Sequence, residues 1–151
     1  MREQKIRMED GISLICESLD GGQDVIFSPS GASMLPTIRE GRDKVTLSTA
    51  PEKLKRGDIA FYRRRDGQFV LHRVVRVRGG YVFCGDNQFA LERGIGKEQI
   101  IAICSHINRG GKDICSGSFA WRFFALRAGI LRFMRRAYHG LRHRIAKIVK
   151  K

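Results

Sequence analysis

Between residues 25 and 107 the chain is a series of short apolar segments, each separated from the next by a turn signal. Glycine-containing turns such as Asp66-Gly67 and Arg78-Gly79-Gly80 join neighbouring segments as hairpins would. No helical pattern alternates with these segments, as a parallel sheet would require. We therefore predict a mainly β domain with an antiparallel core. The expected strands are Val25–Phe27, Lys44–Leu47, Asp58–Tyr62, Phe69–Val77, Tyr81–Cys84 and Ile100–Ile107.

Helical periodicity is confined to the two ends of the chain. Apolar residues recur at helical spacing within residues 9–20, which predicts a short amphipathic helix that covers one end of the sheet. Residues 118–151 predict one long helix, or two helices with a bend near Gly129 or Gly140. The 151-residue chain is therefore divided into an N-terminal amphipathic helix and lead-in (1–24), a β core (25–110) and a basic amphipathic helical tail (111–151).

The formal net charge of +14 is concentrated in the tail, where residues 117–151 contain ten Lys and Arg and no Asp or Glu. Phe123, Ile130 and Met134 fall near one face of the predicted helix, and most of the arginines fall elsewhere. Such a helix suits peripheral contact with an anionic membrane, or packing on its own core with a solvated basic face. The tail contains no recognised nucleic-acid-reading module, so nucleic acid is the least favoured partner.

No signal peptide or membrane span is visible in the sequence. Charged residues interrupt the N-terminal stretch, and no uncharged apolar run reaches the roughly 18 residues that a spanning helix needs. The four cysteines lack metal-binding spacing, and we interpret them as reduced, mostly buried thiols rather than a disulfide framework. These features predict a cytoplasmic protein, or one held peripherally at the cytoplasmic membrane, with no metal and no cofactor.

The motif Gly31-Ala32-Ser33-Met34-Leu35-Pro36-Thr37 suggests a reactive serine, although it also fits an ordinary turn. A serine hydroxyl becomes nucleophilic when a base takes its proton and backbone N–H groups hold the developing oxyanion. A glycine two positions before Ser33 allows a tight turn and leaves room for a substrate backbone. We assign Ser33 as the candidate nucleophile. The candidate substrate-binding residues are Gly31, Ala32, Met34 and Pro36.

His72 lies inside an apolar strand segment, 39 residues after Ser33. Imidazole titrates near neutrality, so His72 suits the role of general base, with a structural histidine as the alternative. Two carboxylates follow it: Asp86 in a Gly-Asp-Asn sequence that also suits a β-turn, and Glu92 before an Arg-Gly pair. Each has the chemistry to orient His72 and stabilise its cation, as the third member of a triad does.

Taken in order, the motifs GxSMxPT, Gly57-Asp58-Ile59, hydrophobic-His-Arg-Val and GDN resemble those of type I signal peptidases and LexA-type repressor peptidases. The resemblance covers about residues 25–107 and implies a coiled antiparallel β core. It also implies a serine endopeptidase that cleaves a signal or leader peptide through an acyl-enzyme. A histidine base is typical of the endoplasmic-reticulum and sporulation-type members. The same resemblance assigns Glu92 as the catalytic acid and Asp86 as a structural or supporting carboxylate.

The chain departs from the family pattern at three points. Gly31 stands where many bacterial signal peptidases have a serine, Glu92 replaces an aspartate, and the usual N-terminal membrane span is absent. Two rival functions also fit the same motifs. One is a repressor-like, self-cleaving regulator, although only about 24 residues precede the core. The other is a non-catalytic binding domain that kept the fold.

Overall fold

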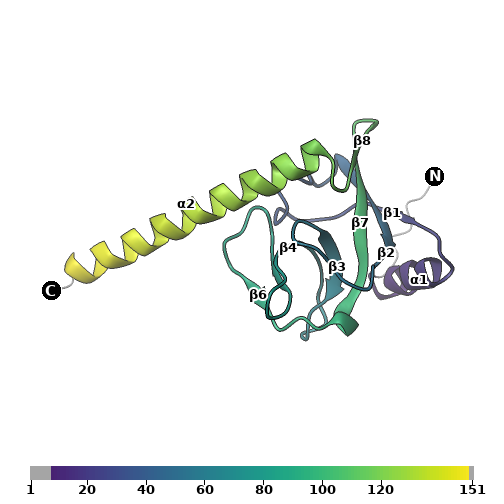
Figure 1. Cartoon of the computed structure of the whole chain (residues 1–151), viewed down its shortest axis with the longest axis horizontal. Coiled ribbons are helices and arrows are strands. Elements are labelled where there is room, and N and C mark those ends of the chain that lie inside the picture. Colours follow the sequence, from purple (N-terminus) through teal and green to yellow (C-terminus); the bar gives the residue numbers. More distant parts are fainter. Residues whose placement is uncertain (1–7, 150–151) are drawn as a thin grey trace.

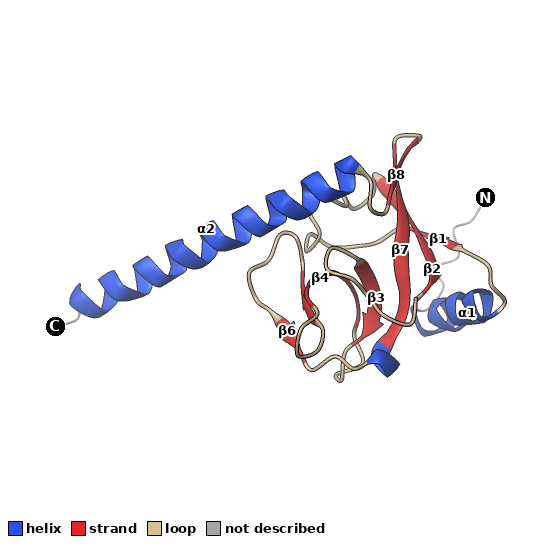
Figure 2. Ribbon diagram, in the orientation of Figure 1, coloured by secondary structure: helices blue, strands red, loops and turns tan. Residues whose placement is uncertain are grey.

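The computed structural model describes residues 8–149, with side chains described from residue 11 to residue 140 and at Arg142. The ends of the predicted N-terminal segment and tail, residues 1–7 and 150–151, lie outside this range. An antiparallel sheet forms the body of the molecule, with α1 beside β1 and β2, while α2 runs out past β4 and β6 (Figures 1 and 2). The elements are α1 (Met8–Asp20), β1 (Val25–Phe27), β2 (Asp43–Thr49), β3 (Ile59–Arg63), β4 (Phe69–Arg76), β5 (Val82–Cys84), β6 (Glu92–Arg93), η1 (Lys97–Gln99), β7 (Ile100–Arg109), β8 (Lys112–Cys115) and α2 (Phe119–Val149).

The eight strands of the described chain pair antiparallel in the order β1-β2-β7-β3-β4-β5-β6, and β8 forms a hairpin with β7. The predicted antiparallel β core is thereby confirmed. Register shifts interrupt the ladders at Thr46/Leu47, Phe61/Tyr62 and Val74/Arg76. Irregularities of this kind bend a strand and increase its twist, so they make the sheet curved.

Residues 59–62 of β3 are all buried and alternate between two apolar cores. The alternation follows from strand geometry, since successive side chains point to opposite faces of a sheet. The larger core also contains Leu19 of α1 and Trp121 of α2, so both helices are joined to the sheet by buried apolar contacts. The smaller core surrounds Tyr62 and Phe83, and Tyr62 contacts His72. Ser33 instead lines a cavity whose apolar wall belongs mainly to the larger core.

The first half of α2 packs on the body along one face. Trp121 is buried, and its indole N–H donates a hydrogen bond of 3.0 Å to the carbonyl of Gly57. Ala128, two turns further along, is also buried. The helix continues through Gly129 and Gly140 without the bend that the sequence left open. No helix in the described residues is both long enough and apolar enough to cross a bilayer.

The six predicted strands are present, and their ends differ from the predicted ends by at most two residues. Two further strands, β6 and β8, are not predicted from the sequence. The two residues of β6, Glu92 and Arg93, are both charged, so no apolar pattern marks them. The segment that we assigned to the tail from residue 111 begins with β8, which belongs to the sheet, and the helix follows it at Phe119.

The four cysteines are unpaired thiols. Cys84 and Cys104 are buried, Cys16 is half-buried and Cys115 is exposed, so fewer of them are buried than the sequence suggested. Burial raises the pKa of the Cys104 thiol to about 12 and also raises the pKa of Cys84. Both buried thiols are therefore protonated and weakly nucleophilic at neutral pH.

Candidate active site

His72 lies on β4, opposite Ala60 of β3, with its side chain only 2% exposed. Its Nδ1–H donates to Oε1 of Glu92 at 2.8 Å. A carboxylate on Nδ1 fixes the neutral ring in the tautomer whose Nε2 is the proton acceptor. Among the described residues Nε2 has no hydrogen-bond partner, so it is the ring atom left free for proton transfer.

Glu92 is held in turn by Tyr62 of β3 and by Arg64, which follows that strand. The Tyr62 hydroxyl donates to Oε2 of Glu92 at 2.9 Å, and Nε of Arg64 donates to the same oxygen at 2.8 Å. Burial alone would raise the pKa of Glu92, but the hydrogen bonds from His72 and Arg64 outweigh burial and hold that pKa well below its usual range. Burial and the adjacent Glu92 charge raise the pKa of Tyr62, so its phenol stays a donor. The carboxylate is therefore ionised where it can stabilise a His72 cation.

Substituting Glu92 with glutamine is expected to make the stability of the fold less sensitive to acid. The lowered pKa of Glu92 lies below that of an unfolded glutamate, about 4.3. Its stabilising effect is therefore complete above that pH and is lost as the pH falls through the folded value. The difference in Tm between wild type and Glu92→Gln should be largest near neutral pH and should shrink below about pH 4. Thermal melts followed by circular dichroism measure this difference.

The matched control for this experiment is Glu52→Gln, which removes an exposed carboxylate. Its melting curve should follow that of the wild type at every pH. A Tm difference between wild type and Glu92→Gln that stays constant from neutral to acid pH would contradict the assigned interactions of Glu92.

The turn that follows β1 brings Ser33 against the loop between β5 and β6. The backbone N–H of Asn87 donates to the Ser33 carbonyl at 2.8 Å, and the Asn87 side-chain amide donates to the Ala32 carbonyl at 3.0 Å. Gly85 makes this approach possible, because a Cβ at that position would lie 2.5 Å from the Ser33 carbonyl oxygen. The Gly-Asn positions of the GDN motif thus hold the backbone of the serine loop.

The pairing of β4 with β5 sets this loop beside the segment that carries His72. Arg73 pairs with Cys84 at the end of this ladder, and Gly85 is the next residue after Cys84. Ser33 also lines a cavity together with the two residues that immediately precede His72. No hydrogen bond joins the Ser33 hydroxyl to the ring, and within the described chain that hydroxyl has no other partner. Catalytic hydrogen bonds commonly shorten only when substrate binds.

Asp86 is fully buried, and its hydrogen bonds go to Arg73 and Thr37 rather than to His72. Nε of Arg73 donates to Oδ1 of Asp86 at 2.8 Å, and Nη2 donates to Oδ2 at 2.6 Å. The Thr37 hydroxyl, at the end of the serine motif, also donates to Oδ2. Of the two candidate acids, Glu92 is therefore the one in contact with the ring, and Asp86 ties the serine loop to β4.

An apolar cavity of about 270 Å³ opens beside Ser33. Its walls come from α1, β1, β3, β4 and the serine loop, including the side chains of Ile12, Ile15, Phe27, Phe61 and Phe69. A concave apolar site next to the candidate nucleophile suits an apolar side chain of a ligand. His72 does not line this cavity. The N-terminal helix α1, which we predicted to cover one end of the sheet, forms part of the wall of this cavity.

Two of the four candidate substrate-binding residues line the cavity, and two do not. Gly31 and Met34 contribute to the wall, and Gly31 has a φ of 91°, a conformation that favours glycine. Ala32 is exposed, and its carbonyl accepts a hydrogen bond from the side-chain amide of Asn87. Pro36 lies outside the wall, and its carbonyl accepts a hydrogen bond of 3.1 Å from Arg109.

Tyr62, Arg64 and Ile12 belong to the site but are not singled out by the sequence. A tyrosine in an otherwise apolar strand is a weak signal, because a buried hydroxyl needs a partner. Ile12 lies on the apolar face of the predicted N-terminal helix, but that pattern does not show that it reaches the site. Nothing in the sequence marks Arg64.

No group of three or more His, Cys, Asp or Glu side chains in the described part of the chain is arranged to hold a metal ion. The chain matches no protein-family model and has no significant match among curated proteins. The arrangement of Ser33, His72 and Glu92 is therefore the basis on which a function is proposed.

Proposed function

We propose that this protein is a serine endopeptidase with the core architecture of the signal peptidase and LexA-type superfamily. The observation that carries the proposal is the 2.8 Å contact between Nδ1 of His72 and Glu92. The loop that leads from β5 to Glu92 also holds the backbone of Ser33, through Asn87. A buried histidine with an ionised carboxylate on one nitrogen and an unpartnered second nitrogen is the base that an activated serine requires.

In this mechanism Nε2 of His72 takes the proton from Ser33 as Oγ bonds to the scissile carbonyl carbon. Glu92 stabilises the imidazolium that forms. The imidazolium then gives its proton to the leaving amine as the C–N bond breaks, which leaves an acyl group on Ser33. Water adds to that ester after losing a proton to His72, and the proton returns to Oγ as the acid product leaves.

Backbone N–H groups are the proposed oxyanion donors, chiefly that of Ser33. Among the described residues the N–H groups of Ser33 and Met34 make no hydrogen bond, so both are free to donate to a ligand. Gly31 has no side-chain donor to offer, so the stabilisation falls to these backbone groups.

The proposed substrate is a polypeptide, such as a signal or leader peptide, bound in extended form. Residues 69–72 of β4 pair with β3 on one edge, and β5 pairs with β4 only from Arg73 onward. The other edge at residues 69–72 therefore has backbone groups available to a peptide that adds as a strand. We place the reaction in the cytoplasm or at the cytoplasmic membrane surface, a proposal supported by the charge of the C-terminal segment.

Labelling with a fluorophosphonate probe tests the proposal directly. We expect the probe to modify Ser33, as mapped by peptide mass spectrometry, and to fail on His72→Ala. Ser30 lines the same cavity, so Ser30→Ala is the matched control and should be labelled like wild type. If His72→Ala is labelled as strongly as wild type, His72 does not activate Ser33 and the proposed mechanism fails. If the protein binds peptides but is never labelled, it is a non-catalytic binding domain instead.

A further inference from the structure

The outer side of α2 carries a continuous apolar stripe that faces away from the body. Every residue of the stripe is more than half exposed: Phe119, Phe123, Leu126, Ile130, Phe133 and Met134. Their spacing of three or four residues places them on one side of a helix, opposite the buried Trp121 and Ala128. We call these six residues the outer stripe. So much contiguous exposed apolar surface is typical of an interaction site.

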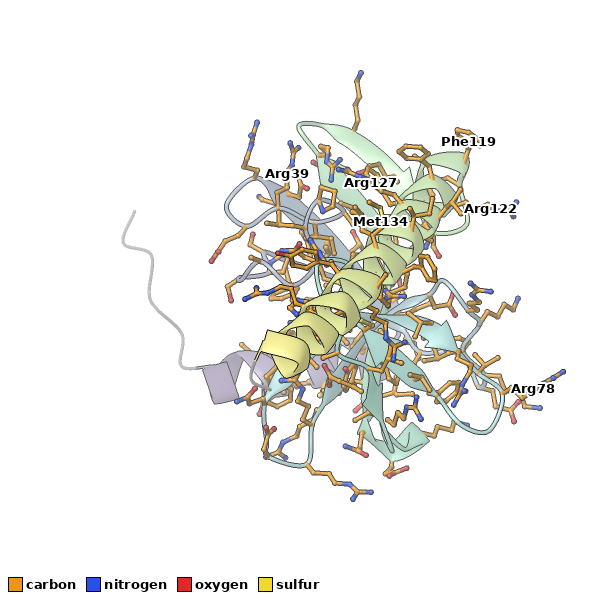
Figure 3. The ribbon with its side chains drawn as sticks, turned by 90° about the vertical axis from the view of Figure 1, so that its left-hand side faces the viewer. Arg39, Arg78, Phe119, Arg122, Arg127 and Met134 are labelled. Carbon is orange, nitrogen blue, oxygen red and sulfur yellow. The ribbon has the colours of Figure 1, made fainter. Side chains whose placement is uncertain are left out.

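Positive charge borders the outer stripe on both sides. Arg122 and Arg127 are exposed and project to opposite sides of α2, with Met134 on the outer surface between those flanks (Figure 3). Residues 117–151 contain no acidic side chain that could neutralise these charges. An apolar stripe with arginine flanks is the pattern of a helix that lies in the interface of a membrane.

A cavity of about 580 Å³ lies beside the stripe, between α2, β4 and the loop that precedes β3. Leu126 belongs to both the stripe and the cavity wall, so the two features are continuous. Asp58 is the one acidic residue of the wall, and Arg73 is already paired with Asp86. The remaining basic side chains of the wall are Lys55, Arg56, Arg122 and Arg132.

Arg132 lines this cavity, and its guanidinium is only partly hydrogen-bonded. Its Nε donates to the Sγ of Cys84 at 3.2 Å, while its Nη2 is buried and has no hydrogen-bond partner among the described residues. Buried polar atoms in folded proteins are nearly always paired, with protein, water or an ion. A phosphate in the cavity would balance the excess positive charge of its wall.

We propose that α2 binds the surface of an anionic lipid bilayer, with the outer stripe among the acyl chains and a headgroup phosphate in the basic cavity. A second copy of α2 is a poorer occupant, because it would set arginine flanks against one another with no carboxylate to pair with them. Anionic headgroups supply the missing negative charge. This inference is independent of the proposed peptidase activity.

Flotation of the full chain with vesicles tests the inference. We expect binding to an equal mixture of phosphatidylcholine and phosphatidylglycerol, and little binding to phosphatidylcholine alone. Binding should be lost at about 1 M salt, where the screening length falls to roughly 3 Å. Ile130→Ser/Phe133→Ser should weaken binding by at least about tenfold, because both exposed side chains lose apolar contact with lipid. Arg122→Gln should weaken it by roughly fivefold.

Two matched controls separate the site from general properties of the protein. Ile26→Ser removes an exposed apolar side chain of β1, and Arg78→Gln removes an exposed charge on the β4–β5 turn, away from α2 (Figure 3). Both should bind the mixed vesicles like wild type. Equal losses in the controls, or equal binding to both kinds of vesicle, would overturn the inference. The inference would also be overturned if the protein does not bind vesicles. Self-association or duplex DNA binding that Ile130→Ser/Phe133→Ser abolishes would then identify a different partner for the outer stripe.

Discussion

Replacing Ser33 with alanine is expected to reduce peptide hydrolysis by a factor on the order of 10⁵ while leaving the fold intact. The loss is large because no other group in the proposed mechanism can form the acyl intermediate. The fold should survive because the Ser33 side chain is half-buried, and within the described chain its hydroxyl makes no hydrogen bond. The contacts that hold this loop use the backbone carbonyls of Ala32 and Ser33, which alanine keeps. Steady-state kcat/KM on quenched fluorescent peptides and the Tm together measure the result.

The pair of Ser33 and His72 should also show the non-additivity of a catalytic unit. His72→Ala is expected to lose about as much activity as Ser33→Ala, and the double variant should be no worse than either alone. Ser30→Ala, in the same loop and cavity, should retain wild-type activity. Cleavage by Ser33→Ala at the wild-type rate would exclude the proposed nucleophile, and strictly additive losses would exclude a shared step.

The strands were predictable because their signal is local. Each of the six predicted segments combines apolar residues with a nearby turn, and strand β3 is the clearest case, since residues 59–62 are buried on both faces. The outward direction of the α2 stripe was not predictable. The sequence shows that one side of α2 is apolar, but the side that packs is decided by Trp121 and its hydrogen bond to Gly57, a long-range contact. An amphipathic pattern alone does not say whether the apolar side faces the core.

In the candidate site, the motif serine and the strand histidine could be named from the sequence, and the family resemblance favoured Glu92 over Asp86. The residues alone left both carboxylates open, and the folded chain shows which one contacts the ring. Glu92 reaches His72 because β6 pairs with β5, where Glu92 stands opposite Phe83. That strand is two charged residues long and carries no periodic signal. Asp86 is nearer to His72 in sequence, yet the fold directs it to Arg73. Sequence distance therefore does not identify which carboxylate meets the ring.

Replacing Arg73 with leucine is expected to destabilise the fold by about 3–5 kcal/mol, because it leaves the Asp86 carboxylate buried without its ionic partner. Asp86 is 0% exposed and Arg73 is 2% exposed, so water cannot take over the lost contacts without local opening. Arg73 also donates to the carbonyl of Gly57 at 2.8 Å, and its guanidinium lies 5.6 Å from the ring centre of Trp121. The substitution therefore removes contacts that connect β4 to the serine loop and to α2. Urea unfolding measures the change in the free energy of unfolding.

The control for this substitution is Arg76→Leu, on the same strand but exposed, which should change stability by less than about 0.5 kcal/mol. Replacing both partners, as Arg73→Leu/Asp86→Leu, should recover part of the loss, because no uncompensated charge remains in the interior. If Arg73→Leu behaves like Arg76→Leu, the buried pair does not support the fold. The two largest effects are also distinguishable in kind. Ser33→Ala should remove activity and keep stability, whereas Arg73→Leu should lower stability and, because Asp86 anchors Thr37 of the serine loop, should lower the activity of the molecules that remain folded.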